Sequence, residues 1–511
     1  MAKRPNFLFI MADQLAPQVL PAYGGAPVRT PHLDRLAAQG VVFDNAYCNF
    51  PLCAPARFSL LSGRLPSRIG AFDNAVEFPA SVPTFHHYLR AGGYRTCLSG
   101  KMHFVGPDQL HGYEERVTTD VYPADFGWVP DLRLDGEAWL EWYHSMRAVL
   151  DAGPHPRSVN VAYDDEAEFE AVRWLHDHAD SGDDRPFALT VSFMSPHDPY
   201  LPPAFWWDRY RDAEIDPPRV GDIPLADRDA YSRRHWFLTG RHIDPVGAAD
   251  IRRMRRAYYA LTSYIDAKVG RLLEALAAIG AAGDTVVVFT SDHGDSLGER
   301  GLFFKMSFFE WSVRVPLILH APFAFAPRRV AQNVSHLDLF PTFLELAGES
   351  GALPELAAPV DGRSLIPLAG GDAAGWPDIV CAEYTAEGAR EPMLMVRKGP
   401  HKLICDRTDP PLLFDLEADP DECENLAGRP DCAGVRAELE SIVAGTWDIE
   451  GLERQVLESQ AVRRVLVGAL GAGRRTSWDY QPLRDASRLY YRDSADVQAA
   501  YSGSVSGPSS T

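Results

Sequence analysis

The sequence predicts an α/β fold, in which a large doubly wound mixed sheet is flanked by helices and a smaller α+β domain follows it. Three near-continuous apolar runs are typical of parallel strands that are covered on both faces, and they lie at residues 6–13, 187–199 and 285–295. An amphipathic helical segment at residues 251–280 precedes the third run and ends in glycine. Because strand and helix patterns alternate, a doubly wound sheet follows, and its ligands bind beyond the carboxyl ends of the strands.

The first strand is predicted inside the opening stretch MAKRPNFLFIMADQL. Its apolar run, FLFIMA, is short, ends at Asp13 and has no small-residue cleavage site after it. We therefore expect a buried strand rather than a secretion signal. The second and third strands, within FALTVSFMSPHDP and TVVVFTSDHGD, also end in polar residues. No run in the chain reaches the length of a membrane span, so we expect no membrane partner.

The C-terminal part of the chain has a different pattern of strands and turns from the part before it. At 511 residues the chain exceeds a single ordinary core. After VDGRSLIPLAGG, short strand patterns separated by turn residues appear in residues 392–406 and 411–427. We therefore predict a catalytic α/β domain over residues 1–370 and a C-terminal subdomain with a small antiparallel sheet over residues 371–511. The Ser/Gly-rich end, residues 502–511, is expected to fray.

The charge balance excludes some partner classes. Seventy acidic residues against fifty basic ones give a net charge of −20. Nucleic acid and anionic membranes are bound by basic surfaces, so we expect neither as a partner. An anionic substrate must then be captured by a local cluster of cations.

The cysteines indicate the compartment. The seven cysteines are odd in number, scattered, and without paired metal-ligand spacing. A disulfide framework is therefore not expected, and a reducing cytoplasm fits this usage.

Oxygen and nitrogen ligands follow two of the predicted strands. Asp13 and Gln14 end the first strand, and Asp292 and His293 follow the third in SDHGD. Together they could hold one divalent cation, Ca²⁺ or Mg²⁺. The alternative is that each pair only caps a turn.

The stretch CAPAR combines a thiol, a proline and a cation at a predicted helix start. Pro55 suits the first turn of a helix, and the free N–H groups there favour an anion. Arg57 lies one turn further on and could hold that anion. The alternative is that Cys53 is a buried structural cysteine beside a surface arginine.

Four more cations occur in separate polar stretches. They are Lys101 and His103 in GKMHFVG, His197 in SPHDP and Lys305 in GLFFKMSFFE. A tetrahedral anion needs several donors around it, and these side chains could supply them. The alternative for any one histidine is an ordinary structural role.

The order of these motifs along the chain resembles the sulfatase family of the alkaline phosphatase superfamily, over nearly the whole length. The resemblance implies an alkaline-phosphatase-like fold and catalytic roles for Cys53, Arg57, Lys101, His103, His197 and Lys305. It implies that the metal ligands are Asp13, Gln14, Cys53, Asp292 and His293. It also implies that a formylglycine-generating enzyme converts Cys53 to formylglycine (3-oxoalanine).

The resemblance further implies how the reaction runs. A hydrated aldehyde has two hydroxyls, so one can attack sulfur while the other remains to release sulfate. A bound cation would lower the pKa of the attacking hydroxyl and neutralise sulfate oxygens. His197 or Lys305 would protonate the leaving alcohol, and His103 would act as the base.

Longer stretches resemble the choline-sulfatase subfamily, namely residues 72–78, 100–128, 381–389 and 477–487. The resemblance implies substrate-binding roles for Asn74, Trp128, His144 and a glutamate, Glu387 or, less favoured, Glu383. A quaternary ammonium is best met by a π face and a carboxylate, which agrees with these residue types. The alternative for the tryptophan is a place in the core.

Residues 488–507 depart from the ending expected of that subfamily, in which the C-terminus reaches toward a neighbouring subunit's site. This departure weakens the choline assignment more than the sulfatase assignment. The resemblance implies a homo-oligomer, a dimer or a tetramer, and we expect it to hydrolyse a small sulfate ester. Choline sulfate is the leading substrate. An arylsulfatase, a phosphonate monoester hydrolase and a non-catalytic binder of sulfated ligands are the alternatives.

Overall fold

The computed structural model describes residues 4–25, 27–134, 138–140, 144–348, 353–474 and 476–483. The strands of the large sheet are β1 (Asn6–Asp13), β2 (Val41–Tyr47), β3 (Arg95–Gly100), β4 (Glu115–Arg116), β5 (Phe187–Pro196), β6 (Thr285–Ser291), β7 (Arg314–Val315), β8 (Leu317–His320) and β9 (Arg328–Ser335). Their order is β4–β3–β5–β1–β6–β8–β2–β7, and β9 pairs with β2.

The predicted parallel strands are the centre of this sheet. β1 runs parallel to β5 on one side and to β6 on the other, with Ile10 opposite Val191 and Phe289. β8 is antiparallel to both β6 and β2, so the sheet is mixed, as predicted. Two strands end earlier than the predicted runs. β5 ends at Pro196 because prolines cannot donate to a ladder, and β6 ends at Ser291 because Asp292 begins the turn of SDHGD.

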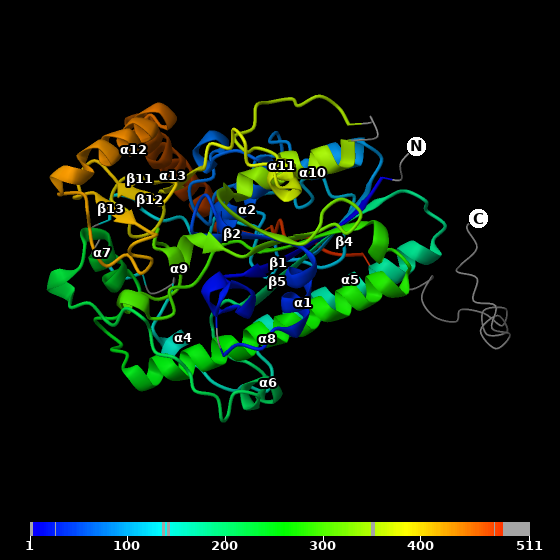
Figure 1. The fold of residues 1–511 in the computed structure, drawn as a ribbon, viewed down its shortest axis with the longest axis horizontal. Coiled ribbons are helices and arrows are strands. Elements are labelled where there is room, and N and C mark those ends of the chain that lie inside the picture. Colours follow the sequence, from blue (N-terminus) through cyan, green and yellow to red (C-terminus); the bar gives the residue numbers. More distant parts are fainter. Residues whose placement is uncertain are drawn as a thin grey trace.

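Helices lie on both faces of the large sheet (Figure 1). They are α1 (Pro31–Gln39), α2 (Cys53–Ser62), α3 (Phe85–Ala91), α4 (Arg147–Leu150), α5 (Val159–Asp180), α6 (Ala204–Asp208), α7 (Ala230–Leu238), α8 (Ala248–Ala278), α9 (Glu310–Val313), α10 (Leu339–Gly348), α11 (Ile366–Gly370), α12 (Ala433–Thr446) and α13 (Ile449–Gly471). The long helix predicted at residues 251–280 is α8. It begins earlier, at Ala248, because the Asp250 carboxylate caps its first turn by accepting from the backbone N–H of Gly247.

The core forms around β1, every residue of which is buried. On one face of β1, the rings of Phe7 and Phe9 contact Phe343 of α10 with centroid separations of 5.2 and 5.7 Å. α5 and α8 pack together and against β5. The helices thus cover a sheet whose central strands end at Asp13, Pro196 and Ser291, and the polar residues that follow these ends meet at one edge.

A second sheet follows in the C-terminal part, as predicted. It is antiparallel, in the order β10 (Ile379–Tyr384), β11 (Met393–Lys398), β12 (His401–Cys405) and β13 (Leu412–Asp415). In Figure 1 it lies beside α12 and α13, in yellow and orange. Within residues 411–427 the strand is only four residues long, because Asp415 and Asp419 accept backbone N–H groups in turns. The boundary at residue 370 stays a prediction, and the expected fraying of residues 502–511 lies outside the described residues.

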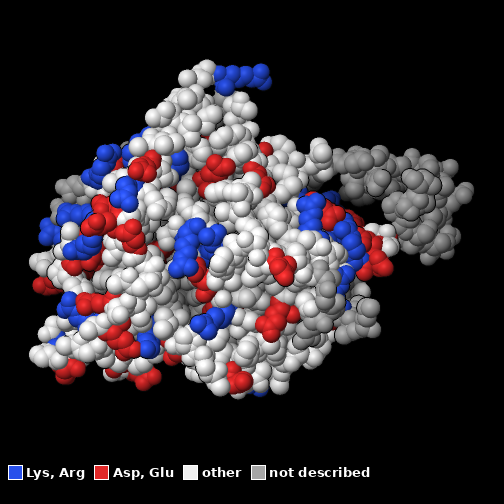
Figure 2. All heavy atoms as spheres, turned by 90° about the horizontal axis from the view of Figure 1, so that it is seen from above, with Lys and Arg blue, Asp and Glu red and all other residues white. Residues whose placement is uncertain are grey.

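The helices, the surface charges and the cysteines bear on the expectations about membranes, charged partners and disulfides. None of the helices in the described ranges has the length and apolar character that a membrane span needs. On the face shown in Figure 2, Lys and Arg side chains are scattered among Asp and Glu side chains. All seven cysteines are free thiols, so the structure contains no disulfide.

Candidate active site

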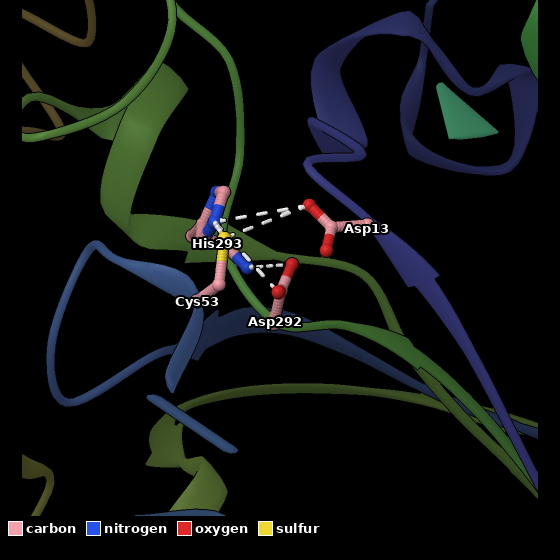
Figure 3. Close-up of side chains that lie close together, drawn as sticks. All are labelled: Asp13, Cys53, Asp292 and His293. Carbon is pink, nitrogen blue, oxygen red and sulfur yellow. Dashed lines mark hydrogen bonds and ion pairs between the residues drawn. The ribbon is translucent and has the colours of Figure 1, made fainter. Parts of the chain in front are cut away.

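Four predicted ligand residues converge where β1, β6 and α2 meet (Figure 3). Asp13 ends β1, Asp292 and His293 follow β6, and Cys53 is the first residue of α2. The Cys53 Sγ lies 3.2 Å from His293 Nε2 and 3.9 Å from Asp13 Oδ1. Their ligand atoms all lie within 4.8 Å of one another, and all four residues are buried. The sequence prediction that these segments form one site therefore agrees with the fold.

Arg57 forms ion pairs with the carboxylates of both Asp13 and Asp292. Its Nη2 donates to Asp13 Oδ2 and its Nε to Asp292 Oδ2, each at 2.9 Å. The Arg57 side chain is fully buried, which excludes the alternative of a surface arginine. Its Nη1 donates to the Lys101 carbonyl oxygen and the Ser192 hydroxyl, so all three nitrogens contact protein groups. Arg57 therefore acts on the site through the two carboxylates that it orients.

Positive charge dominates the surroundings of Cys53. Burial acts to raise the pKa of its thiol, but Lys101, Lys305 and His293 outweigh burial and hold the pKa well below its usual range. The start of α2 adds to this effect, since helix N-termini stabilise thiolates. The Lys101 Nζ also donates to Asp13 Oδ2 at 2.5 Å and lies 4.4 Å from the centre of the Tyr122 ring. These surroundings therefore favour the thiolate form of Cys53.

The donor set fits a hard divalent cation. Burial acts to raise the pKa of Asp13, but the neighbouring Lys101, His197 and Arg57 contribute to holding it well below its usual range, so this carboxylate is ionised. Asp292 adds a second carboxylate to the candidate metal site. Oxygen ligands of this kind suit both Ca²⁺ and Mg²⁺.

Gln14 completes this side of the site. Its backbone is left-handed, with φ 64°, and its carbonyl oxygen accepts from the Tyr258 hydroxyl at 2.6 Å. Its Nε2 donates to Asp295 Oδ2 at 2.6 Å, which turns its Oε1 toward Lys305 Nζ at 2.7 Å. The amide oxygen therefore lies at the border between the metal-type ligands and the predicted cations.

A second cluster surrounds His197. The Lys305 Nζ lies 2.6 Å from His197 Nε2, so these two candidate proton donors are in direct contact. The Asp198 carboxylate lies 3.2 Å from His197 Nδ1 and 3.2 Å from His144 Nδ1. Burial and the nearby Lys305 lower the pKa of His144 to about 4. His144 thus lies in the cluster that holds the predicted proton donors.

His103 and Trp128 contact Tyr122, the ring over which Lys101 lies. The His103 ring lies 5.9 Å from the Trp128 ring and 4.8 Å from Tyr122, and Tyr122 lies edge-on to Trp128. Burial lowers the pKa of His103, and the nearby Cys53 offsets part of this effect. Trp128 is only partly buried, so part of its ring is exposed.

The two candidate glutamates have different surroundings. Glu383 is engaged, because its oxygens accept from the Ser67 backbone N–H and from Trp447 Nε1. Glu387 is buried, and neither of its carboxylate oxygens has a hydrogen-bond partner in the described part of the chain. Burial and the neighbouring Asp73 raise its pKa to about 8. Of the two alternatives, Glu387 is the carboxylate that is available to a ligand.

Asn74 has a structural contact at the start of α2. Its Oδ1 accepts from the Ala54 backbone N–H at 2.9 Å. It therefore fixes the helix turn that carries Cys53, whether or not it also contacts a substrate.

Sequence reasoning missed several residues of the site. Asp198 and Asp295 lie inside the motifs SPHDP and SDHGD. Their closeness in sequence to His197 and His293 could therefore have identified them as site residues. Asp120, which accepts from the backbone N–H groups of Met102 and His103, and Tyr122, which lies under Lys101, carry no such local signal.

Three family models match the chain. The sulfatase model covers residues 5–349, the C-terminal model of N-sulphoglucosamine sulphohydrolase covers residues 298–446, and the choline sulfatase C-terminal model covers residues 454–500. The third match includes most of residues 488–507, so the expectation that this ending departs from choline-sulfatases is wrong.

Individual proteins agree with the family models. The chain is 46% identical over 497 residues to a choline-sulfatase of Rhizobium meliloti (strain 1021), covering 96% of each chain. It is 28% identical to an arylsulfatase of Clostridium perfringens (strain 13 / Type A), covering 83% of this chain and 90% of that one. The phosphonate monoester hydrolase structure of Agrobacterium radiobacter shares 25% identity and a TM-score of 0.69, covering 89% of this chain and 96% of that one.

These matches exclude the alternative of a non-catalytic binder. The sulfatase model covers more than half of the chain, and the structural neighbours have the alkaline-phosphatase-like fold that the resemblance implies. The chain therefore belongs to the sulfatase family and is a sulfuric ester hydrolase.

Proposed function

We propose that the protein hydrolyses choline sulfate to choline and sulfate. The observation that carries the proposal is Glu387, a buried carboxylate with two unpartnered oxygens in the described residues. Lys305 is among the charges that act on its pKa, so both groups belong to one electrostatic environment. A quaternary ammonium cannot donate a hydrogen bond, so a carboxylate and a π face suit it, and Trp128 is the proposed π face. The 46% identical choline-sulfatase supports the same substrate.

Different residues of the site would bind the metal, stabilise the sulfate charge and orient the carboxylates. When bound, a divalent cation held by Asp13, Gln14, Asp292, His293 and the residue at position 53 would supply Lewis acidity, and formylglycine formed from Cys53 would supply the hydroxyl pair of a hydrated aldehyde. Lys101 and Lys305 offer ammonium groups to the sulfate oxygens, as charge stabilisation in a buried site requires. Arg57 keeps the two carboxylates oriented.

Proton transfer falls to the histidines and Lys305. The contact of 2.6 Å between Lys305 Nζ and His197 Nε2 lets either group protonate the choline oxygen as it leaves. His103 lies on the Lys101 side of the site, and the lowered pKa that burial gives it keeps the ring neutral. A neutral imidazole can accept the proton that is released when sulfate departs.

The alternatives are an arylsulfatase and a phosphonate monoester hydrolase. The second is the class of the structural neighbour from Agrobacterium radiobacter, which at 25% identity is much less similar than the 46% identical choline-sulfatase. Both substrates would place an uncharged leaving group near Glu387. That carboxylate would then stay buried without a partner, which is costly, so a cationic leaving group fits better.

The cellular setting belongs to the same proposal. Seven free thiols support a reducing cytoplasm. A formylglycine-generating enzyme is the maturation partner that Cys53 requires. A homo-oligomer, a dimer or tetramer, is the assembly that the subfamily resemblance favours.

Steady-state kinetics test the substrate. Sulfate release from choline sulfate is compared with turnover of 4-nitrophenyl sulfate and of a phosphonate monoester by one preparation. We expect the highest kcat/KM for choline sulfate. A higher value for either other substrate would overturn the choline assignment and leave the sulfatase assignment intact.

A further inference from the structure

Helix α7 (Ala230–Leu238) presents one buried face to two loops of the site. Tyr231, Arg234 and His235 lie three and four residues apart, so their side chains share that face. Each of them donates a hydrogen bond to a backbone carbonyl, and the acceptors lie in the Lys305 loop and in the turn after Glu387. None of the three belongs to the motifs that define the reaction.

Two of these bonds hold the Lys305 loop. His235 Nε2 donates to the Lys305 carbonyl oxygen at 3.1 Å, and the Tyr231 hydroxyl donates to the Met306 carbonyl oxygen. Burial lowers the pKa of His235 to about 3, so its ring is neutral and Nε2 carries the hydrogen. Phe304 and Met306, on either side of Lys305, have φ of 62° and 67°. Bulky residues adopt this left-handed conformation only where surrounding contacts impose it.

The third bond holds the turn that carries Glu387. Arg234 Nε donates to the Gly388 carbonyl oxygen at 2.9 Å, and its Nη1 is anchored by Asp409 at 2.6 Å. Gly388 has φ 81°, and a Cβ added there would lie 3.1 Å from the Leu238 side chain. α7 thus packs directly on this turn.

The same helix contacts the strand before the turn. The Tyr231 ring lies 6.1 Å from the Tyr384 ring, and the Tyr384 hydroxyl donates to the Glu387 carbonyl oxygen at 2.8 Å. One rigid element therefore positions both Lys305 and Glu387.

We propose that α7 fixes the separation between the Lys305 ammonium and the Glu387 carboxylate, and thereby selects the length of the link between sulfate and cation in the substrate. The proposal rests on the proposed function, since it takes Lys305 as the sulfate contact and Glu387 as the cation contact. Tyr231, Arg234 and His235 are positioning residues, because each acts through a backbone carbonyl beside a ligand-binding group. An elongated substrate must match the spacing of both ends at once.

A series of sulfate esters tests this inference. Trimethylammonium alcohols with two-, three- and four-carbon links are sulfated and compared by kcat/KM. The unmodified enzyme should prefer one length, with roughly a 10- to 200-fold loss for one methylene more or less. Arg234→Met keeps the aliphatic stem but removes the bond to Gly388 and the ion pair with Asp409. It should reduce that preference by roughly 3- to 10-fold, the range that one hydrogen bond allows.

Matched variants separate positioning from general damage. Arg234→Lys keeps a donor and should stay near the unmodified preference. Arg233→Gln changes an exposed residue of the same helix and should leave the preference unchanged. Tyr231→Phe removes only a hydroxyl, so it provides a mild second test on the Lys305 side if Arg234→Met does not fold. The length preference is a ratio, which a loss of folded protein does not alter.

Two results would overturn the inference. One is an equal loss for every ester in both Arg234→Met and Tyr231→Phe, because the ratio would then be unchanged. The other is an unmodified enzyme without any length preference. A different result, turnover of neutral alkyl sulfates without turnover of any trimethylammonium ester, would contradict the proposed substrate itself.

Discussion

Replacing Glu387 by glutamine removes the one buried carboxylate that the proposed cation would contact. The change keeps the side-chain shape and leaves the metal-type ligands untouched. A cation and a carboxylate about 5 Å apart attract each other by about 3 kcal/mol at an effective dielectric constant of about 20. The pKa of Glu387 is about 8, because burial and Asp73 raise it. At pH 7 only about a tenth of the carboxyls are ionised, and ionising the rest costs about 1.4 kcal/mol.

The net effect therefore depends on pH. Near pH 7 about 2 kcal/mol remains, so Glu387→Gln should raise KM for choline sulfate roughly 30-fold. Well above pH 8 the full attraction applies and the loss should approach roughly 200-fold. In the unmodified enzyme KM for choline sulfate should fall as pH rises through 8, and in the variant this dependence should disappear. Asp73, Arg463, Lys305 and Tyr231 are among the charged or titratable groups that interact electrostatically with Glu387.

The assay compares choline sulfate with its uncharged isostere, 3,3-dimethylbutyl sulfate, at several pH values. The ratio of the two KM values cancels titrations that affect every substrate. Glu383→Gln serves as the matched control, because Glu383 already binds Ser67 and Trp447. If Glu387→Gln weakens both substrates equally, or if the pH dependence of the ratio persists, the assignment of Glu387 to the cation is wrong.

The same substitution predicts a change in stability. A carboxyl whose pKa is raised in the fold from 4.5 to about 8 favours the protonated form, so it costs stability as pH rises across this window. The full cost is on the order of 5 kcal/mol. Glu387→Gln should therefore be more stable than the unmodified protein at pH 9, and a lower melting temperature there would contradict the cause given for the pKa.

Two further substitutions test the remaining parts of the site. Trp128→Ala should raise KM for choline sulfate by a factor that corresponds to about 0.5–2 kcal/mol of cation–π energy, and it should leave KM for the uncharged isostere unchanged. If KM rises equally for both substrates, Trp128 contributes only packing. Asp292→Ala should abolish metal binding in elemental analysis after dialysis, along with nearly all turnover. It should also lower stability by about 3–5 kcal/mol, because Arg57 would lose a buried partner, and full activity of a metal-free variant would refute the metal site.

Much of the fold could be predicted from local patterns. The three central strands are covered on both faces, so they appear as continuous apolar runs, and their polar ends gave Asp13, His197 and Asp292. The short strands β4 and β7 have two residues each and no such pattern. Their pairing depends on tertiary contacts that periodicity does not contain.

The site residues also differ in how far the sequence could predict them. Motif order along the chain brought Cys53, Asp13, Asp292 and His293 together correctly. The preference for Glu387 over Glu383 came from the resemblance alone, because the partners that engage Glu383, Ser67 and Trp447, lie far away in sequence. The positioning role of α7 could not be predicted from the sequence either. Its side chains donate to backbone carbonyl oxygens, which every residue has, so no particular residue type marks the acceptors.

The proposed reaction depends most on the conversion of Cys53 to an aldehyde, whose hydrate supplies the hydroxyl that attacks the sulfate ester. Peptide mass spectrometry of protein made together with a formylglycine-generating enzyme measures this directly at the CAPAR peptide. We expect an aldehyde at position 53, in a fraction that rises in proportion to the specific activity for sulfate release. Full activity in protein whose Cys53 is entirely an unmodified thiol would show that the reaction does not need the aldehyde.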